Sequence, residues 1–298
     1  MYKEFKYQLD NTSKKFKCPS CNQKRFVRFV DVETKNYVDD KYGRCDREDN
    51  CGYFLHPKEV DTHYQYHYKS KKIEPIIPSF IPREIQIKSL VNYEINPLVN
   101  YLLKSFTESE VFGVVERYQI GTAEMYNGST VFYQIDTKNN IRGGKIMGYN
   151  SDTGKRKKSV KAEINWVHSV LELPNFNLDR CLFGLHLVKK TTKKVAVVES
   201  EKTAIYMSLK LPQYVWVATG GSSNFNLKML EPLSDREVIA FPDKGEAFSK
   251  WKCVADELNS LGYRITVSDI LEDKDLEMGG DLMDVILKFK NQDSADKA

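Results

Sequence analysis

The sequence predicts an α/β protein (α+β overall) with a mostly parallel sheet in its last third and a small metal-binding ribbon at its start. The four apolar residues of Val195–Val198 end abruptly in Glu199, as in a parallel strand buried on both faces. A second apolar run, Val238–Phe241, is followed by Asp243. Four of the six cysteines lie within the first 51 residues. Acidic side chains after such strands lie at the edge where open α/β sheets place their ligands.

The composition is that of an ordinary globular protein. The 298 residues favour two domains with enough chain to bury a core, and 29% of them are charged. Apolar runs stay short of the roughly 18 residues that span a bilayer. The first residues, Met-Tyr-Lys-Glu-Phe-Lys, lack the apolar segment of a secretory signal. We therefore expect a cytoplasmic protein with no membrane partner.

The net charge of +4 is modest, but the charges are unevenly distributed. Basic residues gather at residues 155–158 and again at residues 189–194, and acidic residues gather at 272–284. Each basic patch alone is equally consistent with a solvated loop. Basic patches ahead of an acidic centre favour a polyanion such as nucleic acid as the partner.

The cysteine spacing predicts a structural zinc site. Cys18 and Cys21 form a Cys-x-x-Cys pair, and Cys45 and Cys51 form a second, wider pair. Two turns that each supply two thiolates suit a tetrahedral Zn²⁺. His56 is either a substitute ligand or a lone surface histidine.

Between the cysteine pairs, residues 25–30 alternate basic and apolar side chains, as a strand with one solvated face does. With Lys24, Arg25 and Arg28, such a strand could grip DNA; a purely structural ribbon is the alternative. The remaining cysteines, Cys181 and Cys253, have apolar neighbours, and we expect buried thiols.

The middle of the chain predicts a linker, then helices, then a hairpin. Residues 61–82 have a linker composition, and their prolines exclude a regular helix. A helical pattern starts at Asn96, and Thr107 with Glu110 resembles a capping box. Residues 130–135 and 141–147 are strand-like and are joined by a polar turn, which predicts a β-hairpin.

Acidic residues near the carboxyl end predict a divalent-metal site for phosphate chemistry, because carboxylate oxygens are ligands for Mg²⁺. They are Glu199, Asp243, Asp281 and Asp284. Simpler explanations exist for three of them. Glu199 could be an acid favoured by the dipole at a helix amino terminus. Asp281 and Asp284 could cap the final helix.

The order of these parts resembles bacterial DNA primase, most closely the primase-like proteins of phages and bacterial mobile elements. That family joins a zinc ribbon through a linker to a polymerase core that contains a TOPRIM fold. The four cysteines match the ribbon ligands, and residues 101–121 with the hairpin resemble the start of the core. Residues 198–204 fit the TOPRIM glutamate motif, and Asp281-Leu-Met-Asp284 fits its late acidic motif. The resemblance covers nearly the whole chain, to about residue 290.

The resemblance implies five segments along the chain. They are a zinc-ribbon domain (1–60), a linker (61–82), a helical and β-hairpin primase-like subdomain (83–190), a TOPRIM domain with a mostly parallel sheet (191–290) and a tail (291–298). It implies no helicase within the chain, so a replicative helicase partner is expected in trans.

The resemblance also implies primer synthesis on single-stranded DNA by metal-dependent nucleotidyl transfer from nucleoside triphosphates. The catalytic residues, which would also bind Mg²⁺ or Mn²⁺, would be Glu199, Asp243, Asp281 and Asp284. Glu199 would serve as metal ligand or as general base for the attacking 3′-hydroxyl. The residues that would hold phosphates of template or nucleotide are Arg142, Lys145, Lys155, Arg156, Lys157, Lys158 and Lys202.

One residue departs from the family pattern. TOPRIM proteins carry Asp-x-Asp after the third strand, whereas this chain has Phe241-Pro242-Asp243. Losing a carboxylate weakens Mg²⁺ binding, so catalytic activity stays open. Glu246 is a candidate replacement, and Lys244 adds a positive charge. The alternatives are a catalytically impaired module that binds single-stranded DNA or recruits a helicase for mobile-element replication, and a TOPRIM nuclease.

Overall fold

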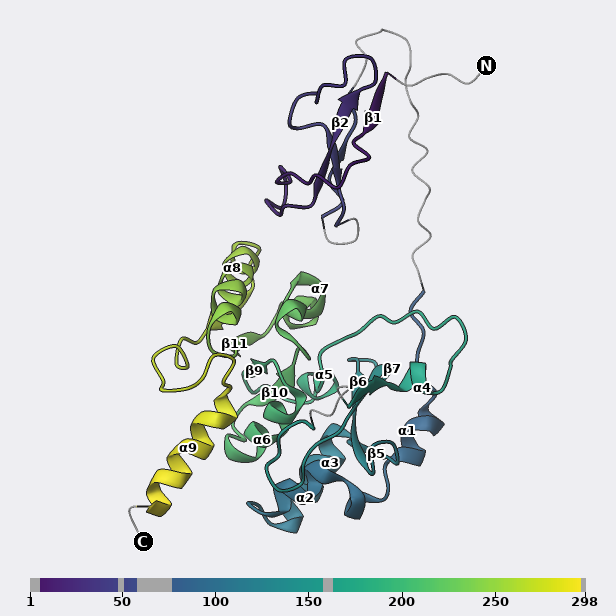
Figure 1. Cartoon of the computed structure of the whole chain (residues 1–298). Helices are drawn as coiled ribbons and strands as arrows, with labels where there is room; N and C mark the ends of the chain where they lie inside the picture. Colours follow the sequence, from purple (N-terminus) through teal and green to yellow (C-terminus); the bar gives the residue numbers. More distant parts are fainter. Residues whose placement is uncertain (1–5, 48–50, 58–76, 158–162, 296–298) are drawn as a thin grey trace. The chain divides into compact units, whose positions relative to one another are not determined.

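Two compact units make up the chain, residues 1–73 and 74–298 (Figure 1). The computed structural model describes residues 6–47, 51–57, 77–157 and 163–295, with side chains to residue 288. Most of the predicted linker (61–82) lies outside the described residues, as does the end of the predicted tail (291–298). No helix within the described ranges is long and apolar enough to cross a membrane.

The amino-terminal unit contains an antiparallel sheet with the strand order β1-β2-β3-β4. Its strands are β1 (Tyr7–Leu9), β2 (Phe26–Asp31), β3 (Gly43–Cys45) and β4 (Phe54–Leu55). The predicted strand at residues 25–30 is thus present as β2. Phe26 is fully buried and packs with Cys18 and Cys45. Gly43 approaches β2 so closely that a Cβ would lie 2.2 Å from the carbonyl oxygen of Val27, which only glycine permits.

The second unit opens with short helices whose caps follow the sequence pattern. Asn96 accepts hydrogen bonds from the N–H groups of Leu98 and Val99 and so caps the second helix. Thr107 and Glu110 form the predicted reciprocal capping box at the start of the third. The helical elements of this part are α1 (Arg83–Ser89), η1 (Tyr93–Ile95), α2 (Pro97–Leu103) and α3 (Glu108–Tyr118).

The predicted hairpin forms the centre of an antiparallel sheet with the strand order β5-β6-β7-β8. Its strands are β5 (Gly121–Ala123), β6 (Ser129–Ile135), β7 (Ile141–Met147) and β8 (Ile164–Trp166). Every residue of β6 is buried, and Lys145 of β7 lies directly opposite the buried Phe132. A charged side chain at such a position must find a partner inside the protein. Two short helices, α4 (Val167–Val170) and α5 (Leu185–Val188), lie between this sheet and the next along the chain.

The third sheet is parallel throughout, with the strand order β10-β9-β11-β12. Its strands are β9 (Val195–Val198), β10 (Val215–Ala218), β11 (Glu237–Phe241) and β12 (Arg264–Val267). The chain passes from β9 to β10 on one side, then returns past β9 to β11 and continues to β12 on the other. The carboxyl edge between β9 and β11 is therefore a topological switch point, where open α/β sheets bind ligands. This sheet, with the antiparallel sheets, confirms the predicted α/β class.

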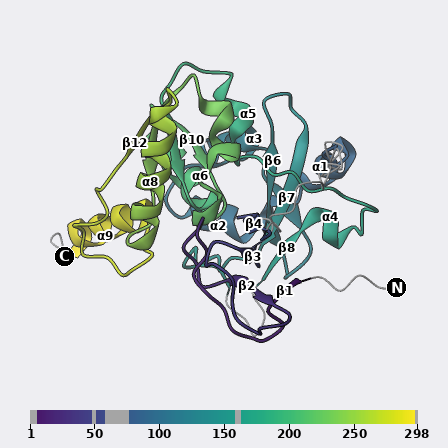
Figure 2. The ribbon, with the colours of Figure 1, turned by 90° about the horizontal axis from the view of Figure 1, so that it is seen from above.

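Helices pack on the outer strands of the parallel sheet. α6 (Glu201–Lys210) contacts β10, and α8 (Glu246–Ser260) contacts β12 (Figure 2). The final helix, α9 (Leu282–Ala295), packs against α6. Three short turns, η2 (Ser222–Asn224), α7 (Leu227–Leu230) and η3 (Glu231–Leu233), connect β10 to β11.

The two cysteines outside the ribbon differ in burial. Cys181 is buried, as predicted, but Cys253 is exposed, so that prediction is wrong. On α8 the buried side chains include Trp251, Ala255 and Leu258, which share one helix face. Cys253 falls on the opposite face, where apolar neighbours in sequence are not neighbours in space.

One hydrophobic core joins the helices, the hairpin and the parallel sheet. Tyr118 of α3 stacks on Phe183 with 5.3 Å between ring centroids. Its hydroxyl donates to the carbonyl oxygen of Trp216 on β10 at 2.9 Å. The predicted domain boundary between residues 190 and 191 falls within this continuous core and stays a prediction.

Candidate functional site

The four amino-terminal cysteines converge on one point. Their sulfur atoms all lie within 4.8 Å of one another, with Cys18–Cys51 at 3.7 Å and Cys21–Cys45 at 3.9 Å. A tetrahedral ion with Zn–S bonds of about 2.3 Å requires sulfur–sulfur distances of about 3.8 Å. Burial raises the pKa of the Cys45 thiol to about 12, so this thiol needs a cation beside it to become a thiolate. The cluster is thus a structural zinc site.

The other ribbon residues lie apart from the sulfur cluster. The His56 ring packs against Phe29 at 4.6 Å between centroids, which favours the interpretation as a lone histidine over that as a ligand. The Arg28 guanidinium lies over the Phe16 ring at 4.9 Å. Lys24 and Arg25 are exposed. Contact between this strand and DNA stays a prediction.

Glu199 and Asp243 follow the two strands that flank the switch point, β9 and β11. The backbone N–H groups of Asp243 and Ser222 lie near enough to the Glu199 carboxylate to lower its pKa. These two residues lie in the loops after β11 and β10, the neighbours of β9. Burial raises the pKa of Glu199 above its usual value, although these two N–H groups oppose the shift.

Asp243 has the most perturbed carboxyl group of the predicted site. Burial raises its pKa to about 8, and the negative charges of Glu199, Asp281 and Asp284 contribute to this rise in that order. These four residues, here called the acidic edge, are thus close enough to interact electrostatically. A strongly raised carboxyl pKa at a ligand-binding edge is typical of functional sites.

Asp281 and Asp284 cap the final helix. The Asp281 carboxylate accepts the Asp284 N–H at 3.0 Å, and the Asp284 carboxylate accepts the Asp281 N–H at 3.1 Å. The Thr203 hydroxyl also donates to Asp281, at 2.5 Å. The simpler explanation of this motif is therefore present in the structure, and its metal-binding role stays a prediction.

The acidic edge is an open site. Among the described residues, only the cysteine cluster gathers three or more ligand atoms of His, Cys, Asp or Glu within 4.8 Å of one another. Mg²⁺ commonly takes one or two carboxylates and completes its shell with water and substrate phosphates. The half-buried, mutually repelling carboxylates of Glu199 and Asp243 fit a divalent cation bound in that way.

Phe241 belongs to the core. It ends β11 opposite Val198 and stacks on Trp216 with 5.7 Å between ring centroids. Glu246 does not replace the missing aspartate, because it is exposed and paired with Lys250 at 2.9 Å. The Lys244 ammonium donates to the Lys274 carbonyl at 2.5 Å, which positions its charge without neutralising it. The effect of that charge on the cluster stays a prediction.

Lys145 is fully engaged inside the protein, contrary to the expectation of a lysine that contacts phosphates. Its ammonium donates to both carboxylate oxygens of Glu201, at 3.0 and 3.1 Å, and to the Gly220 carbonyl at 3.5 Å. Glu201 is itself buried. The sequence carries no sign of this pair, whose members are 56 residues apart.

Arg142 is held by carboxylates. Its guanidinium donates to Asp136 at 2.8 Å and to Asp179 at 2.7 Å. It also lies over the Phe80 ring. These contacts leave some of its N–H groups for other partners, since guanidinium has five donors.

The basic loop, residues 155–157, lies near the acidic edge. Arg156 lowers the pKa of Asp243, and Lys155 and Lys202 lower that of Asp284, which partly offsets the rise from burial. The Lys202 ammonium donates to the Gly154 carbonyl at 3.2 Å and so holds the loop to the start of α6. Lys157 is half-buried, and Lys158 lies outside the described residues. Arg156, Lys155 and Lys202 thus lie near the carboxylates of the acidic edge, and cations of this kind can bind phosphates.

Comparison with known proteins gives two family matches. The family described as "Domain of unknown function (DUF6371)" matches residues 96–244, half of the 298-residue chain. A zinc beta-ribbon finger family matches residues 5–72. No curated protein matches the chain.

Several solved structures are similar to the chain. The primase fragment of the bacteriophage T7 primase-helicase protein is 15% identical, with 95% of this chain and 98% of that one covered and a TM-score of 0.46. The RNA polymerase domain of Mycobacterium tuberculosis primase DnaG is 15% identical, with 72% and 80% covered and a TM-score of 0.45. Aquifex aeolicus primase (zinc-binding and RNA polymerase domains) is 12% identical, with 97% and 79% covered and a TM-score of 0.40.

Proposed function

Since the chain belongs to the family described as "Domain of unknown function (DUF6371)", we propose a function from its own site. The protein is a primase-like enzyme that makes primers on single-stranded DNA by metal-dependent nucleotidyl transfer. The single observation that carries this proposal is the position of Glu199 and Asp243. They follow adjacent parallel strands at the switch point, and burial and the neighbouring carboxylates raise the pKa of Asp243 to about 8.

The raised pKa of Asp243 supports a divalent-cation site. Carboxylates that repel one another in a partly buried position are stabilised in the ionised form by a cation between them. Glu199, Asp243, Asp281 and Asp284 would hold Mg²⁺ or Mn²⁺ against the bound triphosphate. When bound, the metal would supply electrostatic stabilisation of the transferring phosphoryl group.

The side chains of this site have separate tasks in the proposal. Glu199, with its raised pKa, is suited to accept the proton of the attacking 3′-hydroxyl. The basic loop, with Lys202, would hold nucleotide and template phosphates. Arg142 is a further phosphate ligand through its remaining N–H groups. Lys145 acts indirectly, by fixing Glu201 and the Gly220 carbonyl at the entrance to α6.

The wider assignment is a phage or mobile-element primase with a TOPRIM domain that works on DNA in the cytoplasm. The zinc ribbon would select or hold the single-stranded template. Nucleoside triphosphates would be substrates, and a replicative helicase would act in trans. The segment boundaries at residues 60, 82, 190 and 290 are part of this proposal.

The second candidate is a catalytically impaired module that binds single-stranded DNA or recruits a helicase. The packing of Phe241 on Trp216 favours it, because an aromatic ring occupies the position of a second metal-binding carboxylate. The engagement of Asp281 and Asp284 in the cap of α9 also favours it. A TOPRIM nuclease would use the same carboxylates.

Primer synthesis separates these candidates. The full chain is incubated with single-stranded template, ribo- or deoxynucleotides and Mg²⁺ or Mn²⁺. Glu199→Gln should abolish product while leaving template binding near normal. The matched control is Glu246→Gln, which removes an exposed carboxylate that pairs only with Lys250 among the described ion pairs and should retain activity.

The outcomes are distinct. No product from the wild-type chain, together with tight binding of single strands, would exclude the enzyme and favour the binding module. Degradation of the labelled template in place of extension would indicate the nuclease. Synthesis that survives Glu199→Gln would contradict the role given to this residue.

A further inference from the structure

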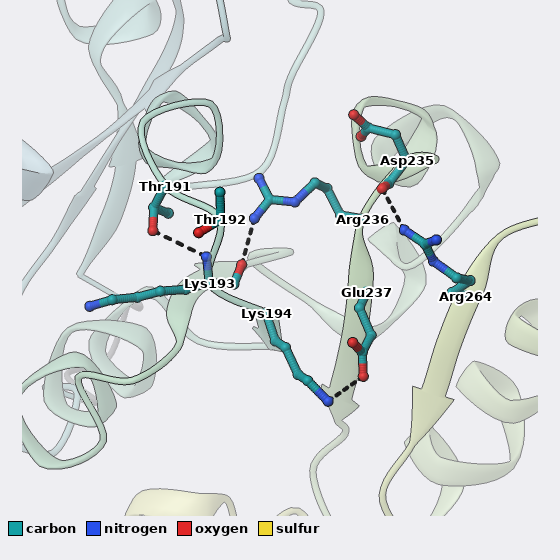
Figure 3. A pocket seen from close by; sticks show the side chains of 8 residues that line it. All are labelled: Thr191, Thr192, Lys193, Lys194, Asp235, Arg236, Glu237 and Arg264. Carbon is teal, nitrogen blue, oxygen red and sulfur yellow. Dashed lines mark hydrogen bonds and ion pairs between the residues drawn. The ribbon is translucent and has the colours of Figure 1, made fainter.

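A basic depression lies on the second unit (Figure 3). Its volume is about 410 Å³. The residues that line it are Thr191, Thr192, Lys193, Lys194, Asp235, Arg236, Glu237 and Arg264. The exposed Lys189 and Lys190 belong to the same loop. We call the six cations at 189, 190, 193, 194, 236 and 264 the amino-edge patch.

The patch lies at the opposite end of the parallel strands from the candidate active site. Lys193 and Lys194 directly precede β9, Arg236 directly precedes β11, and Arg264 is the first residue of β12. Glu199 and Asp243 follow the carboxyl ends of β9 and β11. Because all four strands are parallel, the patch and the acidic edge are on opposite edges of one sheet.

Backbone carbonyl groups orient the cations of the patch. The Arg236 guanidinium donates to the carbonyl of Lys193 at 2.5 Å (Figure 3). It also donates to the carbonyl of Val188 at 2.5 Å and so fixes both ends of the loop between them. Arg264 donates to the Asp235 carbonyl at 2.6 Å. The Lys193 ammonium donates to the Pro212 carbonyl at 2.6 Å. A carbonyl positions a cation without neutralising it.

The charge of the patch is largely uncompensated. Within the described part of the chain, Lys194 is the patch member with a carboxylate ion-pair partner, Glu237. The six cations lie beside two carboxylates, Asp235 and Glu237, which leaves four positive charges. That equals the formal net charge of the entire chain, +4. The formal charges of all other residues sum to zero. The positive charge of this depression is therefore local and does not reflect an excess of basic residues over the whole chain.

The chemistry of the lining selects the kind of polyanion. None of the eight residues that line the depression is aromatic. Proteins that hold single strands generally stack the bases on aromatic rings, whereas a duplex keeps its base faces stacked inside and presents its phosphates on the outside. We propose that the amino-edge patch binds the phosphate backbone of duplex nucleic acid. This second nucleic-acid site does not depend on catalysis at the acidic edge.

The test measures binding by the full chain without added divalent metal, so that the acidic edge cannot contribute through a bound ion. The patch variant carries Lys189→Gln, Lys190→Gln, Lys193→Gln and Arg264→Gln, and it keeps Arg236, which holds the loop. The control variant removes four exposed lysines from separate elements and has the same net charge: Lys88→Gln, Lys138→Gln, Lys252→Gln and Lys288→Gln. The probes are a labelled DNA duplex, a single strand of equal length and polyglutamate.

We expect the patch variant to bind the duplex about tenfold or more weakly than the wild-type chain at about 100 mM salt. Its slope of log K against log salt should become shallower by about 0.9 for each phosphate that the variant no longer neutralises. Duplex binding by the control variant, and single-strand binding by the patch variant, should change far less.

Equal decreases in duplex affinity for the patch and control variants would overturn the proposal, as would equal decreases for duplex and single strand in the patch variant. Unchanged duplex binding together with abolished polyglutamate binding would identify an acidic protein as the partner and also refute it.

Discussion

Replacing Lys145 by methionine should destabilise the second unit strongly, because it leaves a buried carboxylate without its cation. Lys145 is 7% exposed and Glu201 is 1% exposed. The ammonium lies 3.0 and 3.1 Å from the two oxygens of Glu201. Methionine has a similar length and fills the same space, so the change removes the charge and the hydrogen bonds more than the packing.

The expected loss is about 3 to 5 kcal/mol in the free energy of unfolding, the range for breaking a buried ion pair by removing one partner. Glu201 cannot reach water at this burial, so solvent does not replace the missing ammonium. The double variant Lys145→Met with Glu201→Leu removes both charges. It should recover most of the stability, because two apolar side chains of similar volume leave no buried charge behind.

The assay is urea unfolding followed by tryptophan fluorescence. Trp166, Trp216 and Trp251 are the three tryptophans of the chain and all belong to the second unit, so the signal reports that unit alone. Lys138→Met, at an exposed turn, is the control and should change the free energy by less than about 0.5 kcal/mol. A decrease below about 1 kcal/mol for Lys145→Met, or a double variant no more stable than the single one, would refute the reasoning.

Three further predictions concern other parts of the molecule. Burial lowers the pKa of His186 to about 4 from 6.5, so between these pH values the unfolded chain binds one more proton than the folded chain. The free energy of unfolding should therefore fall as the pH is lowered from 6.5 to 4, by up to about 1.4 kcal/mol per pH unit. Urea titrations at a series of pH values should show that His186→Gln removes this slope. Cys45→Ser should eliminate bound zinc and unfold the amino-terminal unit, as measured by metal analysis and circular dichroism. A stoichiometric zinc content in this variant would contradict the four-sulfur site, and Cys253→Ser, which changes an exposed cysteine outside the cluster, is the control. Phe241→Asp should add a carboxylate near Asp243 and raise the Mn²⁺ affinity, measured by calorimetry, about tenfold. It should also lower the free energy of unfolding by about 2 to 3 kcal/mol, because the stacking on Trp216 is removed. An unchanged affinity would show that this position does not face the metal.

The parts of the fold that the sequence predicts are those with a local cause. The capping box at Thr107 and Glu110 needs only a four-residue pattern, and the hairpin at residues 130–147 needs only two strand-like runs and a polar turn. The apolar run of Val195–Val198 predicts a buried strand, because a short run of four β-prone apolar residues that ends in an acid is typical of a central parallel strand.

The candidate site is predictable only in part, because its geometry depends on strand order. The motifs place Glu199 and Asp243 after strands, but only the order β10-β9-β11-β12 makes those strands neighbours. The pairing of Lys145 with Glu201 likewise depends on the packing of β7 beside the start of α6, which no short sequence pattern predicts. The capping of α9 by Asp281 and Asp284 is predictable from the local sequence. A local pattern does not determine whether the same carboxylates also bind a ligand.

The hydrogen bond between Tyr118 and Trp216 has a consequence for how the protein is made. The two residues are 98 positions apart, and they belong to one continuous core. At about 5 to 20 residues per second, a ribosome adds the missing stretch about 5 to 20 seconds after Tyr118 is joined to the chain. During that interval the helices and the hairpin carry an uncovered apolar surface, of the kind that chaperones bind, until β10 has emerged.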